Sequence, residues 1–487
     1  MLQTKLSRIL GLAALVALTA CQSSKGRDFG PIDNLSDVDR AAEKLKAEIL
    51  NTPSDYVVTG KTYYVSQDGS DDNDGLSEKT PFKSLDKING MDFQEGDAVL
   101  FRRGDLWRGQ LRTKPSVSYS AYGTGPKPRL YRSPCNAAQT GSWTETDKPG
   151  VYAFSERYKN DVGTLVFDDG DKGCAYKIMQ NTDYQGNTFH LETGKPFNSY
   201  QDMERDLDMY HDPADGTVYL YSLEGNPAER FKSIELLLHG HCVIVSGGGT
   251  ALDNLCIKYT GSHGIGAGSK KLPFLKVTNC EIGWIGGSIQ HPNPLPTGPG
   301  AFSHPTRFGN GVELWGGCDS YTVSHNYVYQ CYDAGITHQF KTQEPDIYME
   351  NVTYSDNLVE RCVYAIEYFF TVPKEYPGRC SMDHIRITDN ILRLTGTYSW
   401  GYQRPDKITP AAIKAWSSSA NPATDFVIEH NIIDRGDPRL LDVHADQPEW
   451  MPVCRGNIFL QQESLPMGTE IEPDGRVIWL KGEDPES

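Results

Sequence analysis

Three carboxylates in the middle of the chain have the spacing to act together in acid–base chemistry. Glu313 and Glu367 each directly follow a β-branched apolar residue, and Asp333 lies three residues before another. Hydrolysis of a glycosidic bond uses two carboxyl groups, roughly 5 to 5.5 Å apart for retention or 6.5 to 9.5 Å apart for inversion. Crowding of three carboxylates raises the pKa of one of them, as a general acid requires. We therefore expect Asp333 and Glu367 to be the acid and the nucleophile or base, in either order, with Glu313 beside them.

The same carboxylates also fit a second reaction, the β-elimination of a uronic-acid glycan. Elimination needs a base near the sugar C5 and a positive charge that neutralises the uronate. The candidate bases are Lys414, His338, Arg404 and Lys407. In this alternative Glu313, Asp333 and Glu367 would bind calcium instead of transferring protons, so both mechanisms remain open.

Equivalent strands would bring these groups to one outer face. The apolar residues that would point inward from such strands are Val312, Ile336, Ile366, Ile413 and Val443. The residues that follow them would then point outward and form a column of Glu313, Thr337, Glu367, Lys414 and His444. Glu313 and Glu367 would lie two rungs apart, about 9 to 10 Å. The expected substrate-binding residues along this column are Trp315, Gln339, Tyr368, Trp416 and His444.

A repeat marked by asparagine supports the equivalent strands. Asn326 and Asn357 lie in similar segments, SHNYV and SDNLV, and each is followed five residues later by a cysteine, Cys331 or Cys362. The signature recurs, in places loosely, at Asn254, Asn279, Asn390, Asn431 and Asn457. A base period of about 25 to 30 residues with insertions indicates a solenoid of short strands, whose equivalent positions stack. The asparagines would bond to one another at one turn, and the two cysteines would stack inside.

The repeats are accompanied by two motifs, YYVSQDGSDDNDG at 63–75 and TPFKSL at 80–85. Together they resemble the right-handed parallel β-helix superfamily of pectate-lyase-like proteins, which includes bacterial carbohydrate-active lipoproteins. The resemblance spans roughly residues 61–470 and implies an all-β, right-handed parallel β-helix. It implies no single reaction, because that superfamily contains lyases, glycoside hydrolases, epimerases and non-catalytic adhesins.

The N-terminus is typical of an exported protein. Residues 1–20 contain Lys5, Arg8 and an apolar run at 9–18 that is too short for a permanent membrane span, which predicts a signal peptide. The sequence Leu-Thr-Ala-Cys ending at Cys21 resembles a lipobox and implies cleavage before Cys21 and its lipidation. Because Gln22 follows, the resemblance to Gram-negative sorting implies an outer-membrane lipoprotein, at the cell surface or on the periplasmic face.

The rest of the chain divides by composition. The predicted segments are a tether at 21–34, a capping helix and linker at 35–60, first β-helix coils at 61–141, a β-rich insertion at 142–232, the main β-helix with its groove at 233–470, and an acidic tail at 471–487 that is loosely ordered. The helix at 35–50, N-capped by Ser36, would cover the open first coil. A loop at 290–308, rich in Pro, Gly and His, would form a substrate-binding lip.

Two further features concern ligands and covalent links. The cluster Asp68, Asp71, Asp72 and Asp74 has the oxygen density of a calcium loop but lacks the ligand order of an EF-hand, so turn capping is the favoured explanation and calcium the alternative. Neither mechanism otherwise requires a cofactor. Ten cysteines remain after Cys21, and we expect those on repeat positions to be buried thiols, with a Cys135–Cys174 disulfide left open.

The net charge of −17 argues against nucleic acid or anionic lipid as the main partner. We expect a monomer that acts on a polysaccharide and touches the membrane only through its lipid anchor. A glycoside hydrolase is the favoured function and a polysaccharide lyase is the first alternative. A non-catalytic glycan-binding surface protein is the second.

Overall fold

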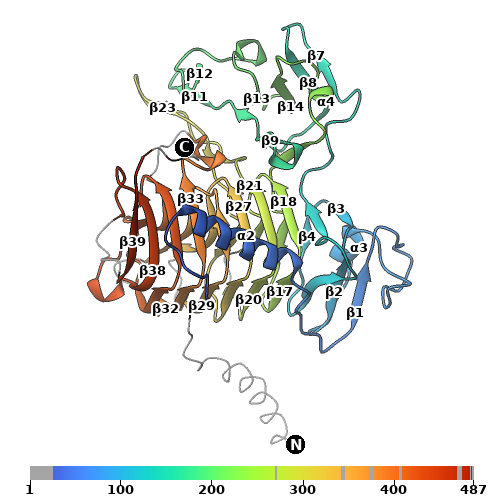
Figure 1. The fold of residues 1–487 in the computed structure, drawn as a ribbon. Coiled ribbons are helices and arrows are strands. Elements are labelled where there is room, and N and C mark those ends of the chain that lie inside the picture. Colours follow the sequence, from blue (N-terminus) through green and yellow to red (C-terminus); the bar gives the residue numbers. More distant parts are fainter. Residues whose placement is uncertain are drawn as a thin grey trace, which may run out of the picture.

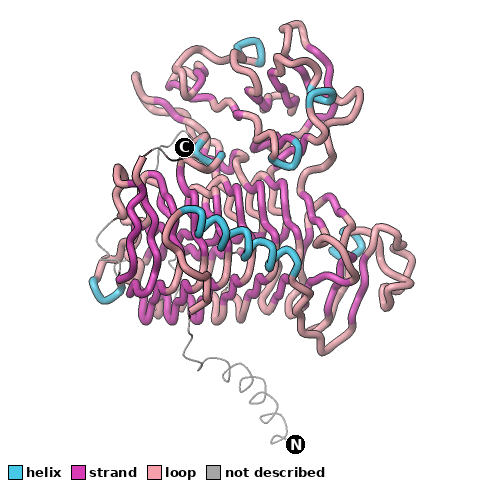
Figure 2. Tube along the Cα trace, viewed as in Figure 1, coloured by secondary structure: helices cyan, strands magenta, loops and turns pink. Residues whose placement is uncertain are grey.

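The computed structural model describes residues 26–268, 271–341, 346–372, 378–404, 409–468, 474–482 and 484. Its main body is a stack of coils, in which each strand pairs in parallel with the equivalent strand of the next coil (Figure 1). Most coils contribute three short strands, one to each of three faces, and strands and loops make up nearly all of the body (Figure 2). The predicted parallel β-helix is therefore confirmed by the strand register.

The three faces are named here first, second and third. The first face consists of β1 (Thr62–Val65), β2 (Ala98–Arg102), β5 (Ser118–Tyr122), β17 (Thr250–Asp253), β20 (Leu275–Thr278), β26 (Tyr321–Ser324), β29 (Met349–Ser355), β32 (Met382–Thr388), β35 (Ala423–Glu429) and β38 (Val453–Gln462). The second consists of β3 (Leu106–Arg108), β6 (Arg129–Tyr131), β18 (Cys256–Thr260), β21 (Glu281–Ile285), β27 (Tyr327–Cys331), β30 (Leu358–Glu360), β33 (Ile391–Gly396), β36 (Ile432–Asp437), the end of β38, and β39 (Asp474–Leu480). The third consists of β4 (Leu111–Arg112), β16 (Val243–Val245), β19 (Ile265–Ala267), β25 (Val312–Trp315), β28 (Ala334–Lys341), β31 (Tyr364–Thr371), β34 (Ala411–Ala415) and β37 (Leu441–Asp442).

A ladder of buried asparagines joins the first face to the second. The side-chain amide of Asn326 donates to Asn357 at 3.0 Å, and the same bond continues to Asn390, Asn431 and Asn457. The residue before each of the first four ladder members has a left-handed φ of 55° to 58°. Asn254 and Asn279 themselves occupy that left-handed position, so they lie one residue before the ladder, contrary to the expected alignment.

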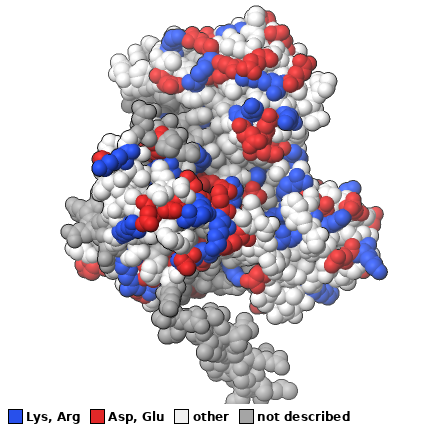
Figure 3. All heavy atoms as spheres, in the orientation of Figure 1, with Lys and Arg blue, Asp and Glu red and all other residues white. Residues whose placement is uncertain are grey.

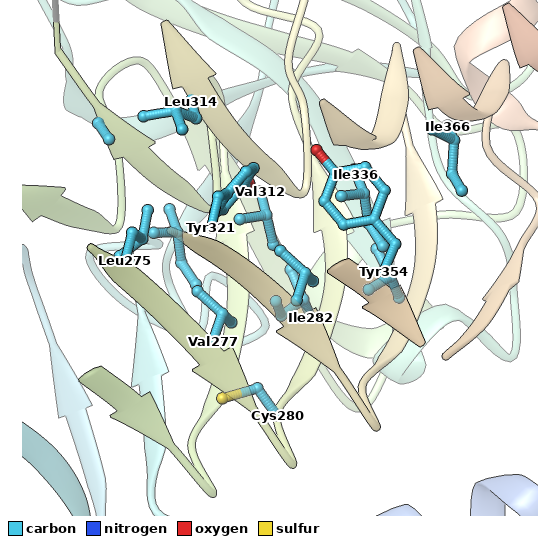
Figure 4. Close-up of a cluster of buried hydrophobic side chains, with 14 of the residues drawn as sticks. Leu275, Val277, Cys280, Ile282, Val312, Leu314, Tyr321, Ile336, Tyr354 and Ile366 are labelled. Atoms are coloured by element: carbon cyan, nitrogen blue, oxygen red, sulfur yellow. The ribbon is translucent and has the colours of Figure 1, made fainter. Parts of the chain in front are cut away.

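Apolar side chains from all three faces fill the interior of the coils. Figure 4 shows this packing for residues such as Val277, Ile282 and Val312, whose strands belong to different faces. Cys331 and Cys362 are fully buried in the same core, as predicted. The ten cysteines of the described residues are unpaired, so a Cys135–Cys174 disulfide is absent.

The predicted helix forms, but it does not cap the first coil. Helix α2 (Leu35–Asn51) is N-capped by Asn34, which accepts from the N–H of Asp37 at 3.2 Å, and not by Ser36. Its buried stripe, which includes Leu45, packs along the second face against Tyr327, Leu358, Ile391, Ile432 and Leu460 (Figure 1). An amphipathic stripe requires an apolar partner, and several consecutive coils provide a longer one than the end of a single coil.

The first coil is closed by the segment that follows β1. Tyr64 donates to the carbonyl of Gly75 and accepts from Phe82, both at 2.8 Å, so the outer edge of β1 is paired. Phe82 and the short helix α3 (Leu85–Gly90) add Leu85 and Ile88 to the core. This pairing protects the edge strand from association with other chains.

The insertion forms a separate β layer above the coils (Figure 1). One sheet contains β10 (Tyr176–Lys177), β13 (Asp208–His211), β14 (Thr217–Tyr221), β8 (Val151–Arg157) and β7 (Trp143–Glu145). Strand β9 (Val162–Phe167) returns to the solenoid by antiparallel pairing with β15 (Ile234–Leu238). The five strands of this sheet lie between residues 143 and 221, inside the range 142–232 expected for the insertion.

The loop at 290–308 is attached to the insertion. It leaves and re-enters the solenoid through β22 (Ile289–His291) and β24 (Thr306–Arg307), which pair antiparallel. Near its tip, β23 (Phe302–Ser303) adds to β11 (Gln180–Asp183), which pairs with β12 (Thr188–His190). The loop therefore forms a wall fixed to both layers.

Two remaining predictions concern the ends of the chain. The expected loose tail is wrong in part, because Asp474–Leu480 forms β39 and extends the solenoid by pairing with β38. Cys21 and the signal peptide lie outside the described residues, and no described helix has the length and apolarity to cross a membrane. Figure 3 shows acidic and basic side chains interspersed on the face that α2 crosses.

Candidate active site

A cavity of about 790 Å³ opens on the outer side of the third face. Its floor comes from β16, β19, β25, β28 and β31, and the 290–308 loop supplies one wall through His291, Thr306, Arg307 and Phe308. Six predicted residues line it: Glu313, Trp315, Asp333, Gln339, Glu367 and Trp416, together with Arg404 from the elimination alternative.

The register of the third face defines two outward columns. The first runs through Ile244, Gly266, Glu313, Thr337, Glu367, Lys414 and Asp442. The second aligns Trp315, Gln339 and Phe369, and Trp416 directly follows the end of the next strand, β34. The predicted column was therefore right for four members, and its last member is Asp442. His444 was expected there because Val443 was aligned with Ile413, whereas Leu441 is the residue that pairs with Ile413.

Glu367 is a buried acid at the centre of the floor. Its side chain is almost inaccessible, at 3% exposure, and its two carboxyl oxygens accept hydrogen bonds from the Gln339 amide and the Trp416 indole. Burial, followed by the negative charge of Asp333, raises the pKa of Glu367 from 4.5 to about 8. Glu367 is consequently protonated at neutral pH, the state that a general acid needs.

Asp333 has the opposite electrostatic environment. Its Oδ1 accepts from the Arg404 guanidinium at 2.7 Å, and the two side chains are 14% and 6% exposed. A guanidinium in contact favours the ionised carboxylate. Asp333 and Glu367 thus form a pair in which one group carries the charge and the other the proton.

Glu313 is two rungs from Glu367, about 9.5 Å along the stack. Its Oε2 accepts from the Thr337 hydroxyl at 2.7 Å and from the Asn310 amide at 2.5 Å. Burial raises the pKa of Glu313 as well. Three carboxyl groups therefore share one cavity, as the sequence predicted.

Four other predicted residues lie elsewhere. His338 and Tyr368 point into the core, where they stack on each other with ring centroids 5.3 Å apart, because they follow outward residues in strict alternation. The Lys414 ammonium turns toward Asp442 and the face of Trp416, and Lys414 does not line the cavity. His444 contacts Asp446 at 3.3 Å, with 39% of its side chain exposed. Lys407 lies outside the described residues.

Sequence reasoning missed several lining residues, above all His241, His263, Phe308 and Phe369. His241, His263 and Asn310 each lie two residues before the inward apolar residue of their strand, at Val243, Ile265 and Val312. Aligning the earlier coils and reading the position two residues before each inward apolar residue would have found both histidines. Phe308 lies in the 290–308 loop that was expected to form a substrate-binding lip, but no pattern singled out this residue, because the loop is outside the repeat.

The acidic cluster at 68–74 serves as turn-capping chemistry. Asp71 accepts from the backbone N–H groups of Lys83 and Ser84, both at 2.9 Å, and Asp74 accepts from the Thr80 hydroxyl at 2.7 Å. Asp68 pairs with Arg102. Within the described residues, no group of three or more His, Cys, Asp and Glu side chains is placed to hold a metal ion. The expected calcium site at Asp68, Asp71, Asp72 and Asp74 is therefore not supported.

No protein-family model matches the chain, and no curated protein matches it in sequence. Among solved structures, a GH136 lacto-N-biosidase from Eubacterium ramulus is 13% identical over 92% of this chain and 70% of that chain, with a TM-score of 0.38. A glycoside hydrolase is 10% identical over 86% of this chain and 96% of that chain, with a TM-score of 0.44. A pectate lyase is 11% identical over 87% and 78%, with a TM-score of 0.30. These likenesses are too distant to indicate a reaction.

Proposed function

We propose that this protein is a glycoside hydrolase that cleaves a polysaccharide or oligosaccharide bound in the third-face cavity. The observation that carries the proposal is the pairing of a buried, protonated Glu367 with an Asp333 held in an ion pair by Arg404. Aromatic side chains at Trp315, Phe369 and Trp416 border the same space and suit the apolar faces of sugar rings.

The two carboxyl groups have distinct roles. Glu367 donates its proton to the glycosidic oxygen as the C–O bond breaks, so the leaving sugar departs as a neutral alcohol. The Asp333 carboxylate faces the positive charge that develops on the anomeric carbon and acts as the nucleophile or as the base for water. Glu367 is then reprotonated, and one water molecule has been consumed.

Elimination receives less support from the same geometry. Its candidate base Lys414 is directed to Asp442, and His338 is inside the core with its Nδ1 bonded to the Tyr354 hydroxyl at 2.7 Å. Arg404 is paired with Asp333. None of the three described candidates, Lys414, His338 and Arg404, therefore combines a basic group with free access to the cavity.

The test is to incubate protein lacking residues 1–21 with neutral and uronic-acid polysaccharides, following new reducing ends and the ultraviolet absorbance of unsaturated uronates. Hydrolysis yields reducing ends without absorbance, and E367Q and D333N should each lower the rate at least a hundredfold. The matched control E156Q removes an exposed carboxylate of the insertion and should leave the rate within twofold. Absorbance rising together with reducing ends would overturn the proposal in favour of elimination.

A second experiment separates the two roles. Azide added to D333A should restore turnover and give a glycosyl azide of inverted configuration, whether Asp333 is the nucleophile or the base. The anomeric configuration of the sugar first released by the wild-type protein, followed by proton NMR, distinguishes retention from inversion. For E367A, substrates with a good leaving group should retain activity, because they need no protonation. If D333A instead depended on the leaving group and E367A did not, the role assignment would be wrong.

We also propose that Cys21 is lipidated and anchors the enzyme to the outer membrane, on the lipobox-like residues 18–21. Metabolic labelling with a radioactive fatty acid should mark the wild-type protein and not C21S. Labelling of C21S, or an unlabelled wild type recovered in the medium, would contradict this assignment.

A further inference from the structure

A recess at one end of the cavity is built from side chains that the proposed reaction does not use. Gly266 occupies the outward position next to Glu313 in the first column. A Cβ on Gly266 would lie 3.0 Å from the His241 ring, so a larger residue here would press on that ring. The floor consequently drops at Gly266, and His241 and His263 form the side of the recess.

The aromatic rings of the recess are stacked. His241 and His263 have ring centroids 4.9 Å apart, and Phe308 continues the stack at 5.4 Å from His263. The 290–308 loop brings Phe308 to this position from outside the repeat. The stack holds both histidine rings in one orientation, so their nitrogen atoms have defined directions.

Backbone hydrogen bonds determine the tautomer of both histidines. The N–H of His263 donates to Nδ1 of His241 at 3.2 Å, and the N–H of Asn310 donates to Nδ1 of His263 at 3.0 Å. A neutral imidazole whose Nδ1 accepts a bond carries its proton on Nε2. Within the described residues, the hydrogen bonds of these two rings are made through Nδ1, and both side chains line the cavity. Each histidine therefore offers one Nε2–H donor to a ligand and cannot act there as a base.

The arginines of the cavity are already engaged by the protein. Among the described lining residues they are Arg307 and Arg404. Arg307 donates to the carbonyls of Gly287, Gln403 and Gly163, while Arg404 pairs with Asp333. Burial lowers the pKa of His241 to about 4 and that of His263 to about 3, so both rings are neutral. A uronate carboxylate would face Glu313 there without a counter-charge, which is unfavourable.

We propose that this recess is a specificity subsite for an uncharged sugar residue, whose hydroxyl or carbonyl oxygens accept hydrogen bonds from Nε2 of His241 and His263. The assignment rests on the proposed function for its place next to the cleaved bond. Ile244, Ala267 and Phe308 supply the apolar contacts that a sugar ring face or a methyl substituent requires. The acidic glycans expected in the elimination alternative are excluded by the same chemistry.

The experiment measures binding without turnover, in the E367Q protein. Titration calorimetry would use cellotriose, xylotriose, maltotriose and a β-1,3-linked galactotriose as neutral probes, and trigalacturonate as the acidic probe. We expect at least one neutral probe to bind, and trigalacturonate to bind at least tenfold more weakly. H241F and H263F, which retain a stacked ring but lose the donor, should each weaken neutral binding at least tenfold. H384F, at a histidine with 53% of its side chain exposed on the first face, is the matched control and should bind normally.

Nitrogen NMR of His241 and His263 tests the proposed hydrogen bonds directly, because their Nε2 signals would not respond to the sugar if the two histidines only stabilised the fold. Both side chains should show the Nε2–H tautomer at pH 7 in the free protein, and the bound neutral sugar should shift their Nε2 signals. A protonated or Nδ1–H ring, preferential binding of trigalacturonate, or the absence of any response to the neutral probes would each overturn the assignment. An inactive wild-type protein that still binds neutral sugar through these histidines would refute hydrolysis alone and leave the subsite standing.

Discussion

The protonation state of Glu367 makes the stability of this protein depend on pH in a way that a single substitution should reveal. The pKa of Glu367 is 4.5 in an unfolded chain and about 8 in the folded protein. Between these values the folded state holds a proton that the unfolded state releases, so the free energy of unfolding falls as pH rises. The stabilising effect of the raised pKa is thus complete below pH 4.5 and lost above pH 8.

The size of the effect follows from the shift. At about 1.4 kcal/mol per pH unit, the shift from 4.5 to about 8 amounts to about 5 kcal/mol. E367Q removes the titration and keeps the shape, so its stability relative to wild type should rise by about 3 to 5 kcal/mol between pH 5 and pH 9. The side-chain amide introduced by E367Q also places an N–H donor against the N–H donor of Gln339 or Trp416. The resulting loss of stability is independent of pH.

Urea unfolding followed by tryptophan fluorescence, repeated at each pH unit from 5 to 9, measures this difference. Two further variants test its cause in opposite directions. D333N removes the neighbouring negative charge and should lower the pKa of Glu367, whereas W416F removes a hydrogen bond to its carboxylate and should raise it. The alkaline limb of kcat/KM should move with the same signs, because Glu367 must be protonated to act as the acid. A stability difference between E367Q and wild type that stays constant from pH 5 to 9 would refute the reasoning.

Three further predictions concern other parts of the molecule. K414M should change kcat/KM less than threefold, because Lys414 faces Asp442 and not the cavity. R404M should lower kcat/KM about a hundredfold, because Arg404 pairs with Asp333. A large effect of K414M would point to elimination. N357A should lower the free energy of unfolding, measured in urea, by about 2 to 4 kcal/mol, because the asparagine ladder loses buried donors and acceptors. A loss below about 0.5 kcal/mol would show that the protein does not depend on the ladder. L45E should lower the free energy of unfolding by about 3 kcal/mol or more, because Leu45 is 1% exposed and packs against the second face. An unchanged Tm in calorimetry would contradict the placement of α2.

Several features of the site were predictable because they depend only on local alternation and on the repeat. Glu313, Thr337 and Glu367 align because side chains alternate along a strand and equivalent strands stack in register. The same alternation, applied to His338 and Tyr368, assigns both to the core, and the prediction that they face the groove broke this rule. The alignment of His444 failed for a different reason, since a loop before β37 shifts the register by two residues and no local pattern marks that shift.

The sequence by itself determined the solenoid, the asparagine ladder and the carboxylate column, because each follows from periodic contacts between neighbouring coils. Only the tertiary structure decided where α2 packs, because an amphipathic stripe requires an apolar partner without specifying which one. The tertiary structure also decided that the 290–308 loop joins the insertion and places Phe308 beside His263. These contacts join segments that are distant in the sequence and lie outside the repeat, so no sequence pattern predicts them. The protonation of Glu367 likewise depends on the tertiary structure, because only the assembled coils and loop bury its carboxyl group and bring Asp333 close to it.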